Sequence, residues 1–159
     1  MAVEVHWQVD SAPLDDAEVI RAVEAALDQG GRSGIAISVV LVDDPTLAEM
    51  HGRFLGDPTP TDVMSFDLGP GTIAEGGEAG EGIDDGPLGE LFVSVERALI
   101  VARERQVSPA RELALYLVHG VLHLCGFDDH EPEDRARMRS AERDVLDRLG
   151  YEPDFGPHE

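Results

Sequence analysis

Residues 119–130 read HGVLHLCGFDDH, and they close a stretch whose apolar residues follow a helical period from residue 109 to residue 125. In such a helix His119 and His123 lie one turn apart and about 40° apart around the axis, on the same face. Two imidazoles in this arrangement can bind one metal ion. Because no other stretch of the sequence places several metal-binding side chains so close together, we expect this helix to carry the functional site.

A third metal ligand is expected directly after the helix. Gly126 favours a left-handed helix end that turns the chain back, so that Asp128, Asp129 or His130 would reach the metal. Three protein ligands leave one position of a tetrahedral zinc open to water, which is typical of catalytic rather than structural zinc. The alternative is that the histidines are ordinary helix residues, but a histidine pair followed by a glycine turn favours metal binding.

The residue after the first histidine limits the chemistry. In the metalloprotease motif HExxH this residue is a glutamate that acts as general base, whereas here it is Gly120. The sequence therefore disfavours an ordinary metalloprotease. Zinc lowers the pKa of a bound water to about 7 and polarises a phosphoryl oxygen, so phosphodiester hydrolysis tolerates the absence of this base. Glu112 and Tyr116 share the histidine face and are candidates to orient a histidine.

Three blocks of the sequence resemble the YbeY family of bacterial rRNA maturation factors. The blocks are HGVLHLCGFD at 119–128, PTDVMSF at 60–66 and LGELFVS at 88–94, and they follow the family's order across nearly the whole chain. The resemblance implies a small, single-domain, zinc-dependent endoribonuclease with a zincin-like metal helix and one Zn²⁺ per chain. It also implies cleavage of single-stranded RNA in 16S rRNA 3′-end maturation and ribosome quality control, with rRNA and ribosomal subunits as partners and no DNA.

The chain departs from the family pattern at the third ligand. In the family this ligand is a histidine separated from the second ligand by five residues, and that position here is Asp129, with His130 one place later. Aspartate also binds zinc. A gapless alignment gives a site of His119, His123 and Asp129. We favour this alignment because it also keeps Met138 at the position that the next helix of the family would give it. A one-residue insertion would bring His130 to the same position instead.

A second departure lies in HGRFLGD at 51–57, where the family often has an arginine after the aromatic residue and this chain has Leu55. Arg53 would then have to take over a role in phosphate binding. Asp62, at the entrance to a strand beside a proline-containing loop, is a candidate cleft residue; the alternative is a carboxylate that caps its own turn. Besides the two histidines, we therefore predict Asp62 and Arg53 as catalytic residues.

The formal net charge of −21 works against nucleic-acid binding, because proteins that hold phosphates normally show a basic patch. The chain has twelve arginines and no lysine, and no basic residue occurs between Arg53 and Arg97. Arg97, Arg103, Arg105 and Arg111 then lead into the metal helix. These four arginines are the predicted RNA-binding set, and the alternative is an ordinary solvated helix face.

The length of 159 residues with 42% hydrophobic content is typical of one globular domain. No run of apolar residues is long enough to span a membrane, and the first residues lack the pattern of a signal peptide. We therefore expect a cytoplasmic protein without a membrane partner; its oligomeric state cannot be predicted. The single cysteine, Cys125, excludes an internal disulfide and is expected to pack in the core.

The order of the predicted elements indicates an α+β fold, a mixed α/β sandwich in which a mixed sheet of about four strands is covered by four or five helices. The segment 69–87 is rich in glycine and acidic residues and is expected to be a mobile loop. On the last helix, alternating arginines and acids are expected to form solvated pairs of little energetic value. Strands are predicted at 3–9, 35–42, 59–66 and 88–95, and helices at 15–29, 44–54, 96–105, 109–125 and 132–149. The pairs Asp44-Pro45 and Ser108-Pro109 are expected to supply the N-cap and the first-turn proline of two of these helices.

Three functions remain compatible with the sequence. A zinc endoribonuclease predicts metal-dependent RNA cleavage. A metal-dependent hydrolase of a small or acyl substrate predicts a narrow pocket and no RNA affinity. A non-catalytic ribosome assembly factor with structural zinc predicts that loss of metal lowers stability while the purified protein cuts nothing. The resemblance favours the endoribonuclease, whereas the net charge does not.

Overall fold

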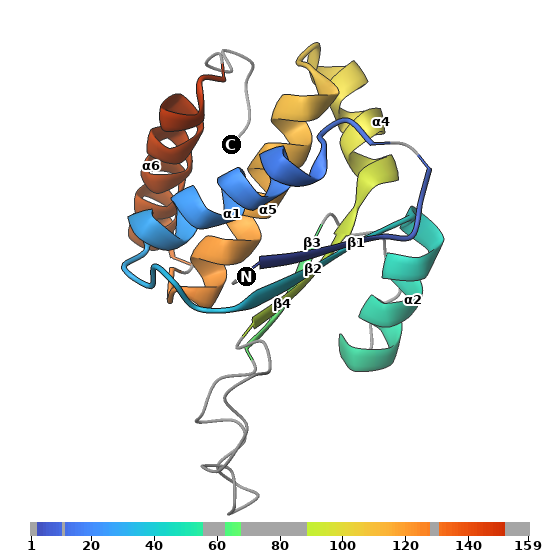
Figure 1. The fold of residues 1–159 in the computed structure, drawn as a ribbon, viewed down its shortest axis with the longest axis horizontal. Helices are drawn as coiled ribbons and strands as arrows, with labels where there is room; N and C mark the ends of the chain where they lie inside the picture. Colours follow the sequence, from blue (N-terminus) through green and yellow to red (C-terminus); the bar gives the residue numbers. More distant parts are fainter. Residues whose placement is uncertain (1–2, 11, 56–62, 68–88, 128–130, 152–159) are drawn as a thin grey trace, which may run out of the picture.

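A four-stranded mixed sheet is covered by helices on both faces (Figure 1). The structure, a computed structural model, describes residues 3–10, 12–55, 63–67, 89–127 and 131–151. The strand order is β1-β2-β4-β3, with the first three of these parallel and β3 antiparallel to β4. The predicted α+β class is confirmed. The elements are β1 (Val3–Trp7), α1 (Asp16–Gln29), β2 (Ile37–Val42), α2 (Asp44–Leu55), β3 (Val63–Asp67), β4 (Gly89–Ser94), α4 (Val95–Arg105), α5 (Pro109–Leu124) and α6 (Pro132–Leu149).

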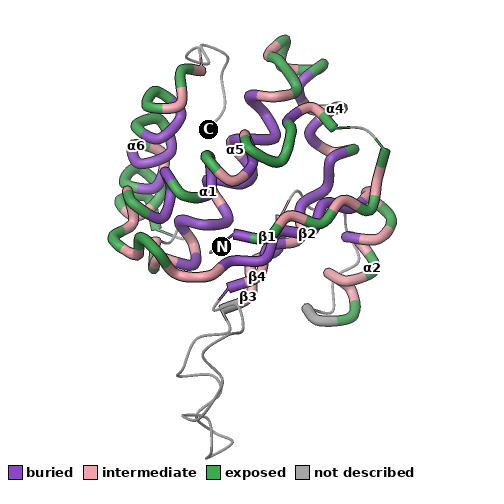
Figure 2. The backbone as a smooth tube through the Cα atoms, viewed as in Figure 1, coloured by how far each residue is buried: buried purple, intermediate pink, exposed green. Residues whose placement is uncertain are grey.

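The two faces of the sheet carry cores of unequal size. Every residue of β2 is buried, as expected for a central strand of a parallel sheet. Alternate residues such as Val39 and Leu41 join the large core beneath α1, α5 and α6, while Val40 and Val42 pack with Leu47 of α2 on the other face. Figure 2 shows the buried residues concentrated along the sheet and α5. The helix with the two histidines is therefore part of the larger core.

Helix α5 begins and ends at residues that the sequence marks. The Ser108 side chain accepts a hydrogen bond from the Arg111 amide, and Pro109 occupies the first turn, where its missing N–H costs nothing. At the other end Gly126 has a φ of +100°, the Gly126 amide donates to the His123 carbonyl and the Phe127 amide to the Leu122 carbonyl. These two bonds form a Schellman motif. The predicted left-handed helix end at Gly126 is confirmed.

Gly120 brings α5 unusually close to the sheet. A Cβ atom at this position would lie 2.9 Å from Leu91 Cδ2, 3.0 Å from Val63 Cγ2 and 3.1 Å from Ser65 Oγ. The Ser65 hydroxyl also donates a hydrogen bond of 3.0 Å to the Gly120 carbonyl, which ties β3 to the helix next to His119. The position that carries a catalytic glutamate in HExxH therefore serves close packing here.

We expect Gly120→Ala to lower the free energy of unfolding by about 1–2 kcal/mol. Overpacking a core costs about 1–3 kcal/mol, and the better helix propensity of alanine returns at most about 1 kcal/mol. Leu91 is fully buried and Val63 is β-branched, so neither side chain yields easily. Urea denaturation of both proteins measures the difference. An increase in stability would show that helix propensity outweighs the close contact.

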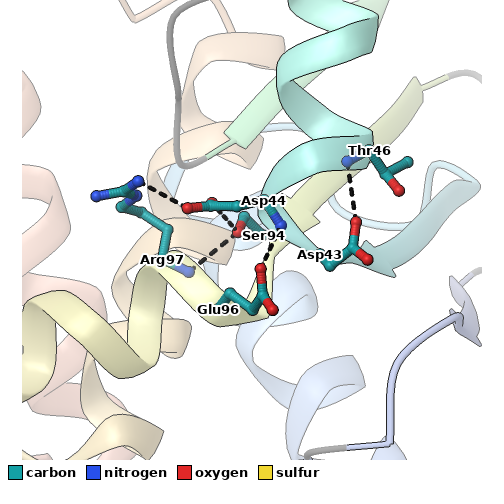
Figure 3. A network of polar contacts seen from close by, with 6 residues as sticks. All are labelled: Asp43, Asp44, Thr46, Ser94, Glu96 and Arg97. Atoms are coloured by element: carbon teal, nitrogen blue, oxygen red, sulfur yellow. Dashed lines mark hydrogen bonds and ion pairs between the residues drawn. The ribbon is translucent and has the colours of Figure 1, made fainter.

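The capping residue of α2 lies one position before the predicted one. The sequence suggested Asp44 as the capping residue, but the Thr46 amide donates to the Asp43 carboxylate, so Asp43 caps the helix. Hydrogen bonds from the Thr46 side chain and backbone lower the pKa of Asp43. Asp44 instead accepts hydrogen bonds from the Ser94 hydroxyl (2.6 Å) and from Arg97 (2.7 Å), which joins the starts of α2 and α4 (Figure 3).

Two further predictions concern Cys125 and the acidic segment. Cys125 packs against the large core, and its sulfur lies so close to Gly30 that a Cβ atom there would clash with it, so the predicted packing role of Cys125 is confirmed. Burial raises the pKa of the Cys125 thiol. The segment 69–87 lies outside the described residues. Among the residues that are described, no helix is long and apolar enough to cross a membrane.

Candidate metal centre

His119 and His123 lie side by side on α5, with ring centroids 4.7 Å apart and ring planes at 80°. Zinc binds imidazole nitrogens at about 2.0–2.1 Å, so two imidazoles on one tetrahedral ion have their ring centres about 5 Å apart. Both side chains are partly exposed, whereas the helix around them is mostly buried. The spacing and the partial exposure fit two ligands that face an accessible metal ion.

A buried carboxylate on α6 holds one of these histidines. Glu142 Oε2 lies 2.5 Å from His119 Nδ1, and the Glu142 side chain is only 8% exposed. An ionised carboxylate can only accept hydrogen bonds, so a hydrogen bond between these two atoms requires the proton on Nδ1, and a neutral imidazole then offers the Nε2 lone pair to a metal. Hydrogen bonding of this kind fixes the tautomer and orientation of metal-binding histidines in many proteins.

Sequence reasoning missed Glu142 and proposed Glu112 or Tyr116 for this role. Glu112 is 1% exposed and faces Arg105 across 3.4 Å, while Tyr116 is buried in the large core. The sequence did contain a signal for Glu142. It falls in the apolar stripe of α6 with Met138 and Val145, and all three are buried. A carboxylate in such a stripe needs a buried partner, which is His119.

The third ligand cannot be assigned from the structure, because Asp129 and His130 lie outside the described residues, as does the catalytic candidate Asp62. Within the described ranges no group of three or more His, Cys, Asp or Glu side chains is arranged to hold a metal ion. The two imidazoles supply part of a donor set that suits zinc.

The predicted arginines are used differently from one another. Arg97 is paired with Asp44, and the Arg105 guanidinium faces buried Glu112. Arg111 is 7% exposed, and burial together with repulsion from Arg105 lowers its pKa. Arg103 is the exposed member of the set. The structure therefore gives Arg97, Arg105 and Arg111 contacts within the protein, and the prediction that all four bind RNA remains a prediction.

Arg53 lies on the last turn of α2, exposed and 3.7 Å from Glu49. Helix α2 packs on the face of the sheet opposite α5 (Figure 1). That Arg53 takes over the phosphate-binding role of the family's arginine remains a prediction.

Comparison with known proteins places the chain in a family. The sequence model of the family described as Endoribonuclease YbeY matches residues 5–150. The chain belongs to the YbeY family. Among YbeY relatives, "Endoribonuclease YbeY" of Symbiobacterium thermophilum is 40% identical over 140 residues, which cover 84% of this chain and 86% of the relative. The protein of the same name from Salinispora tropica is 36% identical over 149 residues, covering 92% of this chain and 94% of the relative.

The solution structure of TM1509 from Thermotoga maritima has the same fold. It superposes with a TM-score of 0.60 at 20% identity, covering 92% of this chain and 88% of that chain. The family resemblance seen in the three sequence blocks is thus confirmed. The histidine pair lies in the block at 119–128, within the region that the YbeY family model matches.

Proposed function

We propose that the chain is a zinc-dependent endoribonuclease that cleaves single-stranded RNA. The observation that carries the proposal is the pair of imidazoles on α5, one of them held by a buried carboxylate, in a chain of the YbeY family. The relatives named above are endoribonucleases by name. The substrate that we propose is the 3′ region of 16S rRNA, bound to ribosomal subunits in the cytoplasm, where cleavage would serve rRNA maturation and ribosome quality control.

One Zn²⁺ per chain would be held by His119, His123 and either Asp129 or His130. Zinc at such a site supplies a nucleophile at neutral pH and polarises a phosphoryl oxygen. The surrounding residues keep the ligands in place. Glu142, in contact with His119 Nδ1, would keep the proton on that nitrogen and leave Nε2 to bind the metal.

Two hydrogen bonds from outside α5 fix the helix along its length. The Ser65 hydroxyl donates to the Gly120 carbonyl beside His119. At the helix end the Arg32 guanidinium donates to the Leu124 carbonyl over 2.8 Å, one residue after His123. A cation at this end also interacts favourably with the helix dipole. Both bonds connect the part of α5 that carries the histidines to other elements of the fold, and support of this kind favours precise ligand geometry.

Zinc content and RNA cleavage, measured on the same purified samples, test this function. The RNA is a fragment that contains the 16S rRNA 3′ end, and the samples are the wild type, Asp129→Ala and His130→Ala. We expect the wild type to hold about one zinc and to cut, and one of the two variants, but not the other, to lose both properties. That variant identifies the third ligand. If the wild type holds zinc but cuts no RNA at any salt concentration, the endoribonuclease proposal is wrong.

A further inference from the structure

The arginines of helix α6 fall on two different sides of the helix. It carries five of the twelve arginines of the chain, Arg135, Arg137, Arg139, Arg143 and Arg148. At about 100° per residue, Arg135, Arg139 and Arg143 lie about 20°, 60° and 100° to one side of Glu142, whereas Arg137 and Arg148 lie more than about 100° to the other side. The three arginines on the first side, spaced four residues apart, form what we call the arginine flank.

The contacts of α6 show which way each side faces. Arg148 lies 3.2 Å from Asp28 of α1, and Arg137 forms an ion pair with Asp134 on the same helix. Glu142, at the border of the arginine flank, contacts His119 of α5 instead. Arg148, and by its angle also Arg137, lies on the side of α6 toward α1. The arginine flank lies on the other side of Glu142, from about 20° to about 100° away from the residue that contacts His119.

Along the helix axis, Arg139 and Arg143 lie at about the same height as the histidine pair on α5. Helices α5 and α6 pack together and run in opposite directions, joined by residues 125–131 (Figure 1). Residues before Glu142 on α6 therefore lie level with residues after His119 on α5. At about 1.5 Å per residue, Arg139 is level with His123 to within a few ångström, and Arg143 is level with His119.

Arg139 and Arg143 differ from most arginines of the chain in their contacts. Arg139 is partly exposed and Arg143 is exposed. Within the described part of the chain neither forms an ion pair, although the protein carries 33 acidic residues. The nearby Asp147, one turn after Arg143, is not within ion-pair distance of it. The sequence suggested that the arginines and acids of this helix pair with one another. Arg137 does so with Asp134, whereas Arg148 pairs with Asp28 of α1, and Arg139 and Arg143 form no ion pair within the described residues.

We infer that Arg139 and Arg143 hold the phosphate backbone of the RNA beside the histidine pair. This inference rests on the proposed endoribonuclease function. It answers how a chain of net charge −21 can bind a polyanion: the binding cations are concentrated on one side of one helix next to the site. Guanidinium groups suit this task because their planar donors match phosphate oxygens. RNA phosphates are the occupant that this charge and position favour.

Two double variants on the same helix test the inference. Arg139→Gln with Arg143→Gln removes two charges from the arginine flank, and Arg137→Gln with Arg148→Gln removes two charges from the opposite side. Binding of a fluorescent single-stranded RNA carrying 2′-O-methyl groups is measured on the zinc-loaded proteins between 50 and 200 mM salt, alongside cleavage of the unmodified RNA.

We expect the flank variant to bind RNA about tenfold more weakly. The negative slope of log K against log salt should become shallower by about 1.4, since each phosphate contact to a single strand contributes about 0.7. The control should change little, and Arg139→Lys with Arg143→Lys should restore part of the slope, because lysine keeps the charge.

Equal losses in the flank and control variants would overturn the inference, because they would indicate a general effect of net charge. No loss in either variant would overturn it as well. A wild type that neither binds nor cuts RNA would instead contradict the proposed function itself, so the two failures can be told apart.

Discussion

Replacement of His123 by alanine is expected to abolish zinc binding and RNA cleavage together. The substitution removes one of two adjacent imidazoles, whose ring centroids lie 4.7 Å apart, and leaves at most two protein ligands for the ion. Catalytic zinc sites use three protein ligands, so the variant should hold far less than one zinc per chain after dialysis. Zinc content is measured by atomic emission, and cleavage is followed on the same sample.

His6→Ala is a suitable control for this experiment. His6 lies on β1, its side chain is 53% exposed and it lies 3.5 Å from Glu4, far from α5 in the sequence and on another element. The control should keep its zinc and its activity. If His123→Ala retains one zinc, the histidine pair is not the metal site. If it loses zinc but still cuts RNA at the wild-type rate, the cleavage does not depend on this metal.

Glu142→Gln should weaken zinc binding by about 10–100-fold, the usual effect of losing a partner that orients a metal-binding histidine. Glutamine has nearly the shape of glutamate, but its amide is a neutral and weaker acceptor for the Nδ1 proton of His119. The dissociation constant is measured by competition with a chelator of known affinity. A nitrogen NMR spectrum of the metal-free protein should show His119 protonated at Nδ1 in the wild type and a mixture of tautomers in the variant.

Glu112→Gln separates this positioning role from a purely structural one. Glu112 is also a buried acid, on the same helix as His119, but its partner is Arg105. Loss of that pairing should lower thermal stability while the zinc affinity stays as in the wild type. If both glutamine variants lose stability and neither loses zinc affinity, Glu142 is only a packing residue. If Glu142→Gln alone binds zinc more weakly, its carboxylate positions His119.

Local signals in the sequence predicted the elements around the site well. Ser108 and Pro109 mark the start of α5, and Gly126 marks its end, because capping and left-handed turns depend on a few neighbouring residues. The histidine pair follows from the helical period alone. The error at α2 was small for the same reason: two adjacent acids precede Pro45, and either can cap a helix whose proline occupies the first or second position.

Contacts between helices could not be predicted in the same way. Nothing in the local sequence shows that Arg111 is buried or that Arg105 faces Glu112, since both depend on how α4 packs against α5. Glu142 is an intermediate case. Its place in the apolar stripe of α6 is readable from the period, but its partner His119 lies 23 residues away on another helix.

Zinc titration of the metal-free chain during RNA cleavage tests the central claim most directly. If the chain is an endoribonuclease with one zinc held by the histidine pair, the initial cleavage rate should rise linearly with added zinc and stop rising at one equivalent. His123→Ala should show no such rise. Full cleavage by the metal-free wild type, or no cleavage once one zinc is bound, would contradict this account.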